Sequence, residues 1–214
     1  MRSFYLTALV LGLLTAVGPL AINMYLPALP VIEDVFDTDT VTVQLSLLSF
    51  FVSMSLAQLI YGPLSDMFGR RLPLFIGLTL YLLGAVGSAL APDIQWLIAA
   101  RALQGLGAAA GMVIARAVIR DLYTGPQAAQ LMATLMLVVS IAPVLAPLAG
   151  SAALAAGGWR TIFWSMAAAA IAASGAMEPS AAAATGGVRT AGPCCRQSHS
   201  AEKSCSRASV PSAR

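Results

Sequence analysis

Arg101 and Gln104 are the residues whose types and spacing most clearly invite chemistry, because both stand inside the long apolar stretch at residues 94–119. Arg101 comes about seven residues into that stretch, or ~10 Å along a helix that rises ~1.5 Å per residue. A charged group so deep in an apolar helix is costly and usually faces a polar cavity or a partner. Gln104 follows at helical spacing, so one helix face should carry a guanidinium and an amide together.

The first apolar stretch, residues 3–30, contains the polar residue Asn23. An amide can hydrogen-bond a ligand but does not titrate, so Asn23 cannot carry a proton. The stretches at 3–30, 94–119 and 128–156 contain no carboxylate. An acid that exchanges protons with such a site must therefore lie elsewhere.

Nucleophilic, redox and zinc chemistry lack their usual residues over most of the chain. The cysteines Cys194, Cys195 and Cys205, the single histidine His199 and the single lysine Lys203 all follow residue 193. Their spacing matches no familiar set of metal ligands, and the apolar stretches hold no catalytic pair of carboxylates. We therefore expect no enzyme activity, no metal site and no cofactor.

The elements that must position these residues are expected to be membrane-spanning helices. The chain is 58% hydrophobic and 10% charged, with a mean hydropathy of +0.82, which leaves too little charge for the surface of a soluble domain. A spanning helix needs about 20 predominantly apolar residues. Six stretches qualify or come close, at residues 3–30, 41–65, 72–91, 94–119, 128–156 and 160–176. The first is too long for a cleaved signal peptide, so we expect an all-α polytopic membrane protein.

Charges between these stretches predict which helix ends face the cytoplasm. The bases on one side are Arg2, Arg70, Arg71 and Arg120, and the acids on the other are Glu33, Asp34, Asp37 and Asp39. The positive-inside rule then places the N-terminus and the loops at 66–71 and 120–127 inside. Arg116 should extend to the same inner surface, whereas Arg160 is a base against the trend.

The formal charge of +3 belongs to the C-terminal tail, because residues 1–175 carry as many arginines as acids. This distribution gives no reason to expect a nucleic-acid partner. Residues 177–214 are rich in Ala, Ser, Gly and Pro without any aromatic residue, so we expect disorder there. A loss of the reading frame would explain that composition, and a natural flexible tail is the alternative.

The turn between the second and third stretches reads Gly-Pro-Leu-Ser-Asp-Met-Phe-Gly-Arg-Arg at residues 62–71. Gly62 is expected to allow close helix approach, and Gly69 to let the chain turn tightly. Asp66 and Arg70 are four residues apart and can pair if the turn is helical. Arg70 and Arg71 should anchor the inner interface.

Prolines and glycines mark two further helices. Pro143 and Pro147 stand four residues apart in the fifth stretch and precede Gly150, so this helix should bend. In the fourth stretch Gly107 and Gly111 form a Gly-x-x-x-Gly pair, which favours packing against another helix over substrate contact.

These patterns resemble those of one group of membrane transporters. The loop at 62–71 matches the Gly-x-Leu-x-Asp-x-x-Gly-Arg-Arg loop of the major facilitator superfamily. Its Leu-x-x-x-Arg-x-x-Gln-Gly-x-Gly pattern resembles Leu97, Arg101, Gln104, Gly105 and Gly107. Pro143 to Gly150 resembles the antiporter motif of its exporters, with Ser151 in place of a glycine. Residues 23–30 closely resemble the Asp-Met-Tyr-Leu-Pro-Ala-Leu-Pro segment of the Bcr/CflA multidrug exporters, although Asn23 replaces the acid.

The resemblance covers about residues 5–172 and implies the six-helix N-terminal half, at 1–176, of a twelve-helix fold. It implies a bacterial inner-membrane exporter that expels drugs or small metabolites in exchange for protons. Substrate would bind near the midplane between two bundles, with Asn23, Tyr25, Arg101 and Gln104 as candidates for binding or coupling. At the inner surface the resemblance places Arg70 beside Asp121 and leaves Asp66 without the second-half helix that it would cap.

With only the first half present, we expect a truncated chain that is inactive by itself. Arg101 would then meet lipid, a water defect or another copy, at ~2.5–3.5 kcal/mol on insertion scales. One alternative is a half-size transporter that restores the opposing bundle as a homodimer. Another is a membrane structural or interaction subunit without transport activity.

Overall fold

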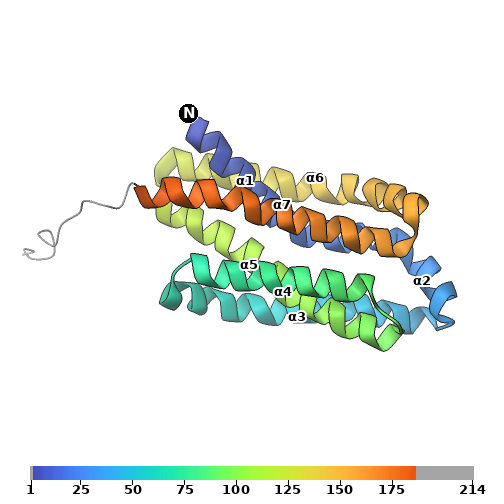
Figure 1. Ribbon diagram of the computed structural model, residues 1–214. Helices are drawn as coiled ribbons and strands as arrows, with labels where there is room; N and C mark the ends of the chain where they lie inside the picture. Colours follow the sequence, from blue (N-terminus) through green and yellow to red (C-terminus); the bar gives the residue numbers. More distant parts are fainter. Residues whose placement is uncertain (1, 187–214) are drawn as a thin grey trace, which may run out of the picture. The chain divides into compact units, whose positions relative to one another are not determined.

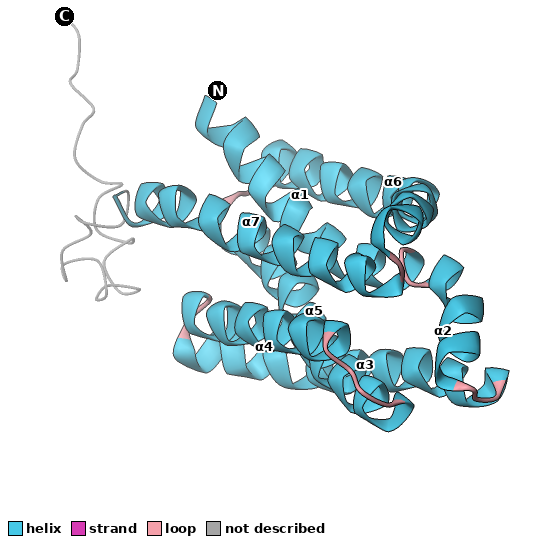
Figure 2. Ribbon diagram, turned by 45° about the vertical axis from the view of Figure 1, so that its right-hand side comes forward, coloured by secondary structure: helices cyan, strands magenta, loops and turns pink. Residues whose placement is uncertain are grey.

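The computed structural model describes residues 2–186, which form helices and short turns (Figure 1, Figure 2). The elements are α1 (Arg2–Asn23), the 3-10 helix η1 (Leu26–Ala28), α2 (Leu29–Phe36), α3 (Thr40–Phe68), α4 (Arg71–Ala89), α5 (Ile94–Leu122), α6 (Gly125–Gly157) and α7 (Trp159–Gly186). No strand occurs in this described part of the chain. The expected all-α fold is therefore confirmed.

Five segments of the described chain are long and apolar enough to cross a membrane. They are Val10–Phe36, Thr40–Phe68, Arg71–Ala89, Ile94–Asp121 and Gly125–Gly157. α7, the helix of the sixth predicted stretch, does not reach this standard of length and hydropathy within the described residues. The bounds of α3 to α6 lie within three residues of the predicted stretches, because a turn with charged residues or glycine bounds each apolar run.

The first predicted helix is interrupted, which corrects the expectation of one helix over residues 3–30. α1 ends at Asn23, η1 follows, and α2 continues to Phe36. Pro27 and Pro30 occupy the first turns of η1 and α2, where a missing N–H leaves no helical hydrogen bond unmade. Asp37 then ends α2 in the left-handed conformation, with φ 45°.

At the other end, α7 continues ten residues beyond the predicted boundary at 176, to Gly186. Residues 181–184 are four alanines, the residue type with the highest helix propensity, so helix forms where disorder was expected. The compact helical unit ends at Glu178. The rest of the predicted disordered tail, with Cys194, Cys195 and Cys205, lies outside the described residues.

α5 lies at the centre of the packing, in contact with α1, α3, α4 and α6, and α1 in turn packs against α6 (Figure 1). Three glycines of α5 permit the close approach of its neighbours, because a Cβ atom on each would come within 3.0 Å of a neighbouring backbone. Gly105 abuts Phe50 of α3, Gly107 abuts Tyr81 of α4, and Gly111 abuts Leu14 of α1. The expectation that Gly107 and Gly111 serve helix packing is confirmed.

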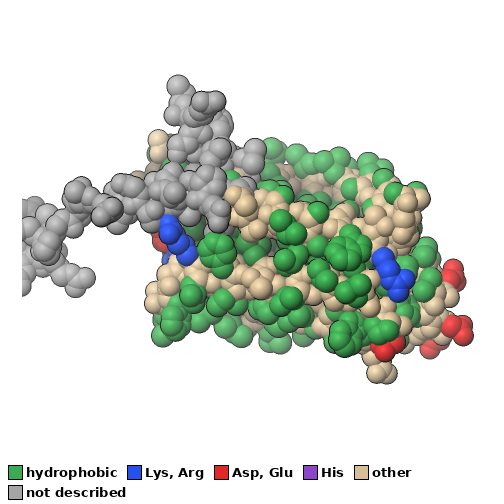
Figure 3. All heavy atoms as spheres, viewed as in Figure 1, with side chains coloured by type: hydrophobic (Ala, Val, Ile, Leu, Met, Phe, Trp, Pro, Cys, Tyr) green, Lys and Arg blue, Asp and Glu red, His purple; other side chains and the backbone are tan. Residues whose placement is uncertain are grey.

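α3 and α6 carry the broadest exposed apolar faces. Only 22% of the most apolar window of each is buried, against 50–61% for the other three spanning segments. The exposed large side chains include Leu48, Val52 and Leu59 on α3, and Leu137, Val144 and Leu148 on α6. Figure 3 shows hydrophobic side chains over the flank of the bundle and charged ones near its ends, as expected of helices that cross a bilayer.

Candidate functional site

The start of α5 sets the position of Arg101. The Asp93 carboxylate accepts a hydrogen bond of 2.7 Å from the Trp96 N–H, an N-cap that fixes where the helix begins. Arg101 follows two turns into the helix, and its side chain is fully buried, as is that of Gln104. The two polar residues share a helix face as expected, and that face points into the bundle.

Hydrogen bonds and aromatic rings hold the Arg101 guanidinium. One terminal nitrogen donates to Gln104 Oε1 over 2.8 Å, and both terminal nitrogens reach the carbonyl oxygen of Ala21 in α1 at 3.4 Å. The guanidinium carbon also lies 4.1, 4.8 and 5.7 Å from the ring centres of Tyr25, Phe50 and Phe163. Desolvated cation–π contacts are worth up to ~2 kcal/mol or more each, so the rings offset part of the cost of burying the charge.

Arg101 makes no ion pair with a carboxylate in the described part of the chain, where Asp66 and Asp121 pair with Arg70 instead. Its Nε is buried without a hydrogen bond. Burying an unpaired charge costs several kcal/mol, and an unmade buried hydrogen bond adds about 1–3 kcal/mol. Stability therefore gives no reason for an arginine here, and a functional role is the default reading of such a residue.

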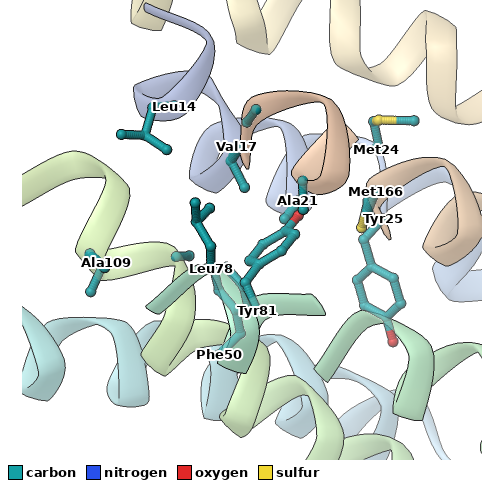
Figure 4. Packing of buried hydrophobic residues seen from close by; sticks show 14 of the residues in the cluster. Leu14, Val17, Ala21, Met24, Tyr25, Phe50, Leu78, Tyr81, Ala109 and Met166 are labelled. Carbon is teal, nitrogen blue, oxygen red and sulfur yellow. The ribbon is translucent and has the colours of Figure 1, made fainter. Parts of the chain in front are cut away.

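Tyr25 and Gln104 connect the arginine to neighbouring helices. The Tyr25 hydroxyl lies 2.7 Å from Ser46 Oγ in α3, and its ring centre lies 5.7 Å from that of Phe163 in α7. Gln104 Nε2 lies 3.6 Å from the sulfur of Met166, also in α7. These contacts join α3, α5, α7 and the turn after α1 at one point, and Figure 4 shows Tyr25 and Met166 among the buried residues there.

Asn23 stands apart from the other three candidates. Its Nδ2 donates to the Pro19 carbonyl of its own helix over 2.8 Å, and its side chain is only partly buried. Tyr25, Arg101 and Gln104 are enclosed in the core. The expectation that Arg101 meets lipid, a water defect or another copy is therefore wrong for this bundle, because aromatic rings from three segments close over it.

The sequence did not single out four members of this cluster: Ser46, Phe50, Phe163 and Met166. They stand in stretches where every apolar or small residue can face either the core or lipid. Only contacts between distant segments distinguish them, and no local pattern records such contacts.

A second group of charges lies where the end of α3 approaches the end of α5. Arg70 contacts both acids expected near it, Asp66 at 2.7 Å and Asp121 at 2.8 Å, and it also donates to Ser65. The hydrogen bond with Asp121 raises the pKa of the Arg70 guanidinium above its ordinary value. Asp66 and Asp121 are 67% and 49% exposed, so solvent screens both pairs and each contributes only ~0–1 kcal/mol.

The same charges border a pocket of about 240 Å³ between α3 and α5. We call it the inner pocket, because the loop charges predict that this end of the bundle faces the cytoplasm. Arg116 and Arg120 lie on its α5 wall, and Gly62 lies on its α3 wall. A Cβ atom at Gly62 would meet nothing within 4 Å, so the expectation that Gly62 allows close helix approach is wrong. Gly69 does turn the chain, with φ 79°.

The prolines of the fifth predicted stretch lie inside α6, which runs without interruption through Pro143 and Pro147. The Ser151 hydroxyl donates to the Pro147 carbonyl over 2.8 Å. Gly150 is buried against the backbone of Met24, where a Cβ atom would clash. Gly150 thus brings α6 against the turn that carries Tyr25.

Comparison with known proteins agrees with this architecture. The family model described as Major Facilitator Superfamily matches residues 11–184. The chain is 44% identical to the MFS-type transporter YdgK of Bacillus subtilis over 158 residues, which are 73% of this chain and 39% of that protein.

Two further relatives are named for drug resistance. A chloramphenicol resistance protein of Pseudomonas aeruginosa is 34% identical over 158 residues, 73% of this chain and 38% of that protein. A bicyclomycin resistance protein homolog of Haemophilus influenzae is 32% identical over 163 residues, 76% of this chain and 41% of that protein. The chain thus spans about two fifths of the length of these relatives.

Proposed function

Because the chain belongs to the major facilitator superfamily, we propose that it serves the export of drugs or other small molecules across the bacterial inner membrane. Proton antiport would drive the export, and the N-terminus would lie in the cytoplasm. The relatives named for resistance to chloramphenicol and bicyclomycin support a drug-like substrate. The arginines near the inner pocket support the orientation, by the positive-inside rule.

The observation that carries this proposal is the buried Arg101 without an acidic partner in the described residues. An unbalanced positive charge lowers the pKa of any acid that comes near and attracts an anionic or electron-rich group. Such a charge suits a protein whose interactions must change when a proton or a substrate arrives. Gln104 and Tyr25 would hold the guanidinium in place, while the partly accessible Asn23 would contact substrate.

Transport by alternating access needs two bundles that move about one site. The described helices form one bundle, and the exposed apolar face of α6 is a surface available to a second. We infer that the second bundle comes from further polypeptide or from a second copy of this chain. The 214-residue chain would then not transport substrate when it is expressed alone and remains monomeric.

The test is chloramphenicol accumulation in bacteria that lack their own exporters. The chain would be expressed alone, and also together with the second half of a full-length relative such as YdgK. We expect accumulation to fall only when the second half is present, and to rise again on adding a protonophore. Failure of every combination at matched expression levels would contradict the proposal.

Arg101→Ala provides the matched control within the site, and Gly175→Ala the control outside it, because a Cβ at Gly175 would meet no atom within 4 Å. Only Arg101→Ala should abolish efflux. Efflux by the chain alone that Arg101→Ala abolishes would favour a working homodimer over a chain that needs a second half.

A further inference from the structure

Arg116 and Arg120 are two positively charged side chains on the wall of the inner pocket. They are four residues apart on α5, so their guanidinium groups project from the same face of the helix. Both residues are exposed, and neither forms an ion pair within the described residues. Like charges at this spacing repel each other, so an anion between them would be stabilised.

The acids of the inner pocket do not fill this place, because Arg70 engages both of them. Asp66 lies 2.7 Å and Asp121 2.8 Å from nitrogens of Arg70. Three arginines therefore face two paired aspartates, and the excess positive charge belongs to Arg116 and Arg120. The planar fork of a guanidinium matches the oxygens of a phosphate group, which makes phosphate the anion of best fit.

The size and surroundings of the pocket indicate what carries the phosphate. A volume of about 240 Å³ corresponds to roughly eight waters at ~30 Å³ each, enough for a partly hydrated head group. Leu59, one turn before Gly62 on α3, is 76% exposed, and Ile60 is 61% exposed. An exposed apolar helix face thus begins next to the charged pocket. This arrangement fits a lipid, with its charged head group and apolar chain, better than a free ion.

We propose that the inner pocket binds an anionic phospholipid, with Arg116 and Arg120 holding its phosphate group and the exposed face of α3 contacting an acyl chain. The pocket lies at one end of two membrane-spanning segments, the level at which lipid head groups lie. Basic pockets between spanning helices are general hosts of anionic head groups. The site is separate from the Arg101 cluster, so occupancy does not depend on transport.

The test is native mass spectrometry of the full chain after exposure to equimolar phosphatidylglycerol and phosphatidylcholine in detergent micelles. We expect retention of phosphatidylglycerol, reduced about fivefold or more by Arg116→Gln and by Arg120→Gln. Arg71→Gln is the matched control, because it removes the same charge from the same end of the bundle outside the pocket lining. Equal retention of the two lipids, or an equal loss in all three variants, would overturn the proposal.

Two further measurements keep the result interpretable. Arg116→Lys and Arg120→Lys preserve charge but lose the guanidinium fork, so retention should fall here as well if a built site is involved. The melting temperature of the wild-type chain should rise with short-chain phosphatidylglycerol and stay constant with inorganic phosphate. An equal rise in melting temperature with inorganic phosphate would assign the pocket to a dissolved anion and overturn the lipid assignment. If the two lysine variants retain phosphatidylglycerol as well as the wild-type chain, positive charge alone accounts for binding, and the proposal of a built guanidinium site is overturned.

Discussion

Arg101 combines complete burial, three aromatic neighbours and an Nε without a partner. A methionine could occupy much of the same volume without a charge to desolvate. Replacing buried charges by apolar residues of similar volume is often neutral or stabilises a protein by about 1–4 kcal/mol. The side chain therefore offers a direct test of whether the site was shaped by stability or by function.

We expect Arg101→Met to raise the free energy of unfolding of the bundle by about 1–4 kcal/mol, because the desolvation cost disappears. Unfolding by sodium dodecyl sulfate in mixed micelles, followed by tryptophan fluorescence, measures this change. Arg101→Lys is the control: it keeps the charge but loses the contact with Ala21 and should destabilise the bundle. A large loss of stability in Arg101→Met would show that the guanidinium holds the helices together.

The sequence identified Arg101 and Gln104 because a polar residue in an apolar run stands out against its neighbours. It did not reveal their burial, since Phe50 and Phe163 come from helices about fifty or more residues away in the chain. Asn23 and Tyr25 were grouped with them because the family resemblance implies one substrate site, although the Asn23 side chain bonds its own helix and Tyr25 reaches α3. Local patterns thus give the chemistry of a site more readily than its accessibility.

At the scale of helices, the glycines of α5 decide how closely its neighbours approach. Gly62 and Gly107 are both helical glycines inside a motif, and the structure gives them opposite surroundings. A Cβ at Gly107 would clash with the backbone of Tyr81, whereas a Cβ at Gly62 would meet open space.

We expect Gly107→Ala to lower the free energy of unfolding by about 1–3 kcal/mol, because the backbone of α4 must move. Gly62→Ala should raise it by about 0.5–1 kcal/mol, since alanine replaces glycine inside an exposed helix without a clash. Thermal unfolding in detergent, with aggregation followed by size-exclusion chromatography, compares the two variants. Equal effects in both would mean that these glycines act only through helix propensity.

The contact between the ends of α3 and α5 should be weak despite its short distances. A double-mutant cycle of Arg70→Gln and Asp121→Asn should give a coupling free energy of ~0–1 kcal/mol, because both groups are exposed and screened. Raising the salt concentration should reduce the coupling further. A coupling above about 2 kcal/mol would indicate a shielded pair.

Arg160 illustrates why the loop charges alone did not predict every position. Its Nε and a terminal nitrogen donate to the carbonyl oxygens of Ala89, the last residue of α4, and Ala91, at 3.1 and 3.3 Å. It also lies 4.4 Å from the ring centre of Trp159. A base at a helix C-terminus is favourable wherever that end lies, so Arg160 serves α4 and does not weigh against the orientation.

For the whole molecule, the central prediction is the orientation in the membrane. With Cys194, Cys195 and Cys205 replaced by serine, Asp34→Cys should react with a membrane-impermeant thiol reagent in intact cells. Gln127→Cys, at the other end of the bundle, should react only after the membrane is permeabilised. Both positions are exposed in regular helix, whereas Asp37 has a left-handed backbone that a new cysteine would strain. The opposite labelling pattern would invert the proposed topology.

At this scale the bounds of α3 to α6 lie close to the stretches predicted from the sequence, because apolar runs and the turns between them are local signals. It did not predict the break after Asn23, since a proline-rich run is compatible with both a continued helix and a turn. It could not predict which helices touch. The pairing of α1 with α6 and the central place of α5 arise from fits between distant surfaces.

The packing of α1 against α5 and α6 determines when α1 can reach its final contacts during synthesis. α5 and α6 both pack against α1. They begin at Ile94 and Gly125, about 70 and 100 residues after α1 ends. At ~5–20 residues per second, α1 waits roughly 5–20 s before synthesis of the second of these helices begins. During that interval Leu14, which is buried in the folded bundle, must remain in lipid or in the insertion machinery. Slower translation would prolong this interval. We therefore expect the fraction of newly made chains that is degraded to be highest when ribosomes stall between α1 and α6.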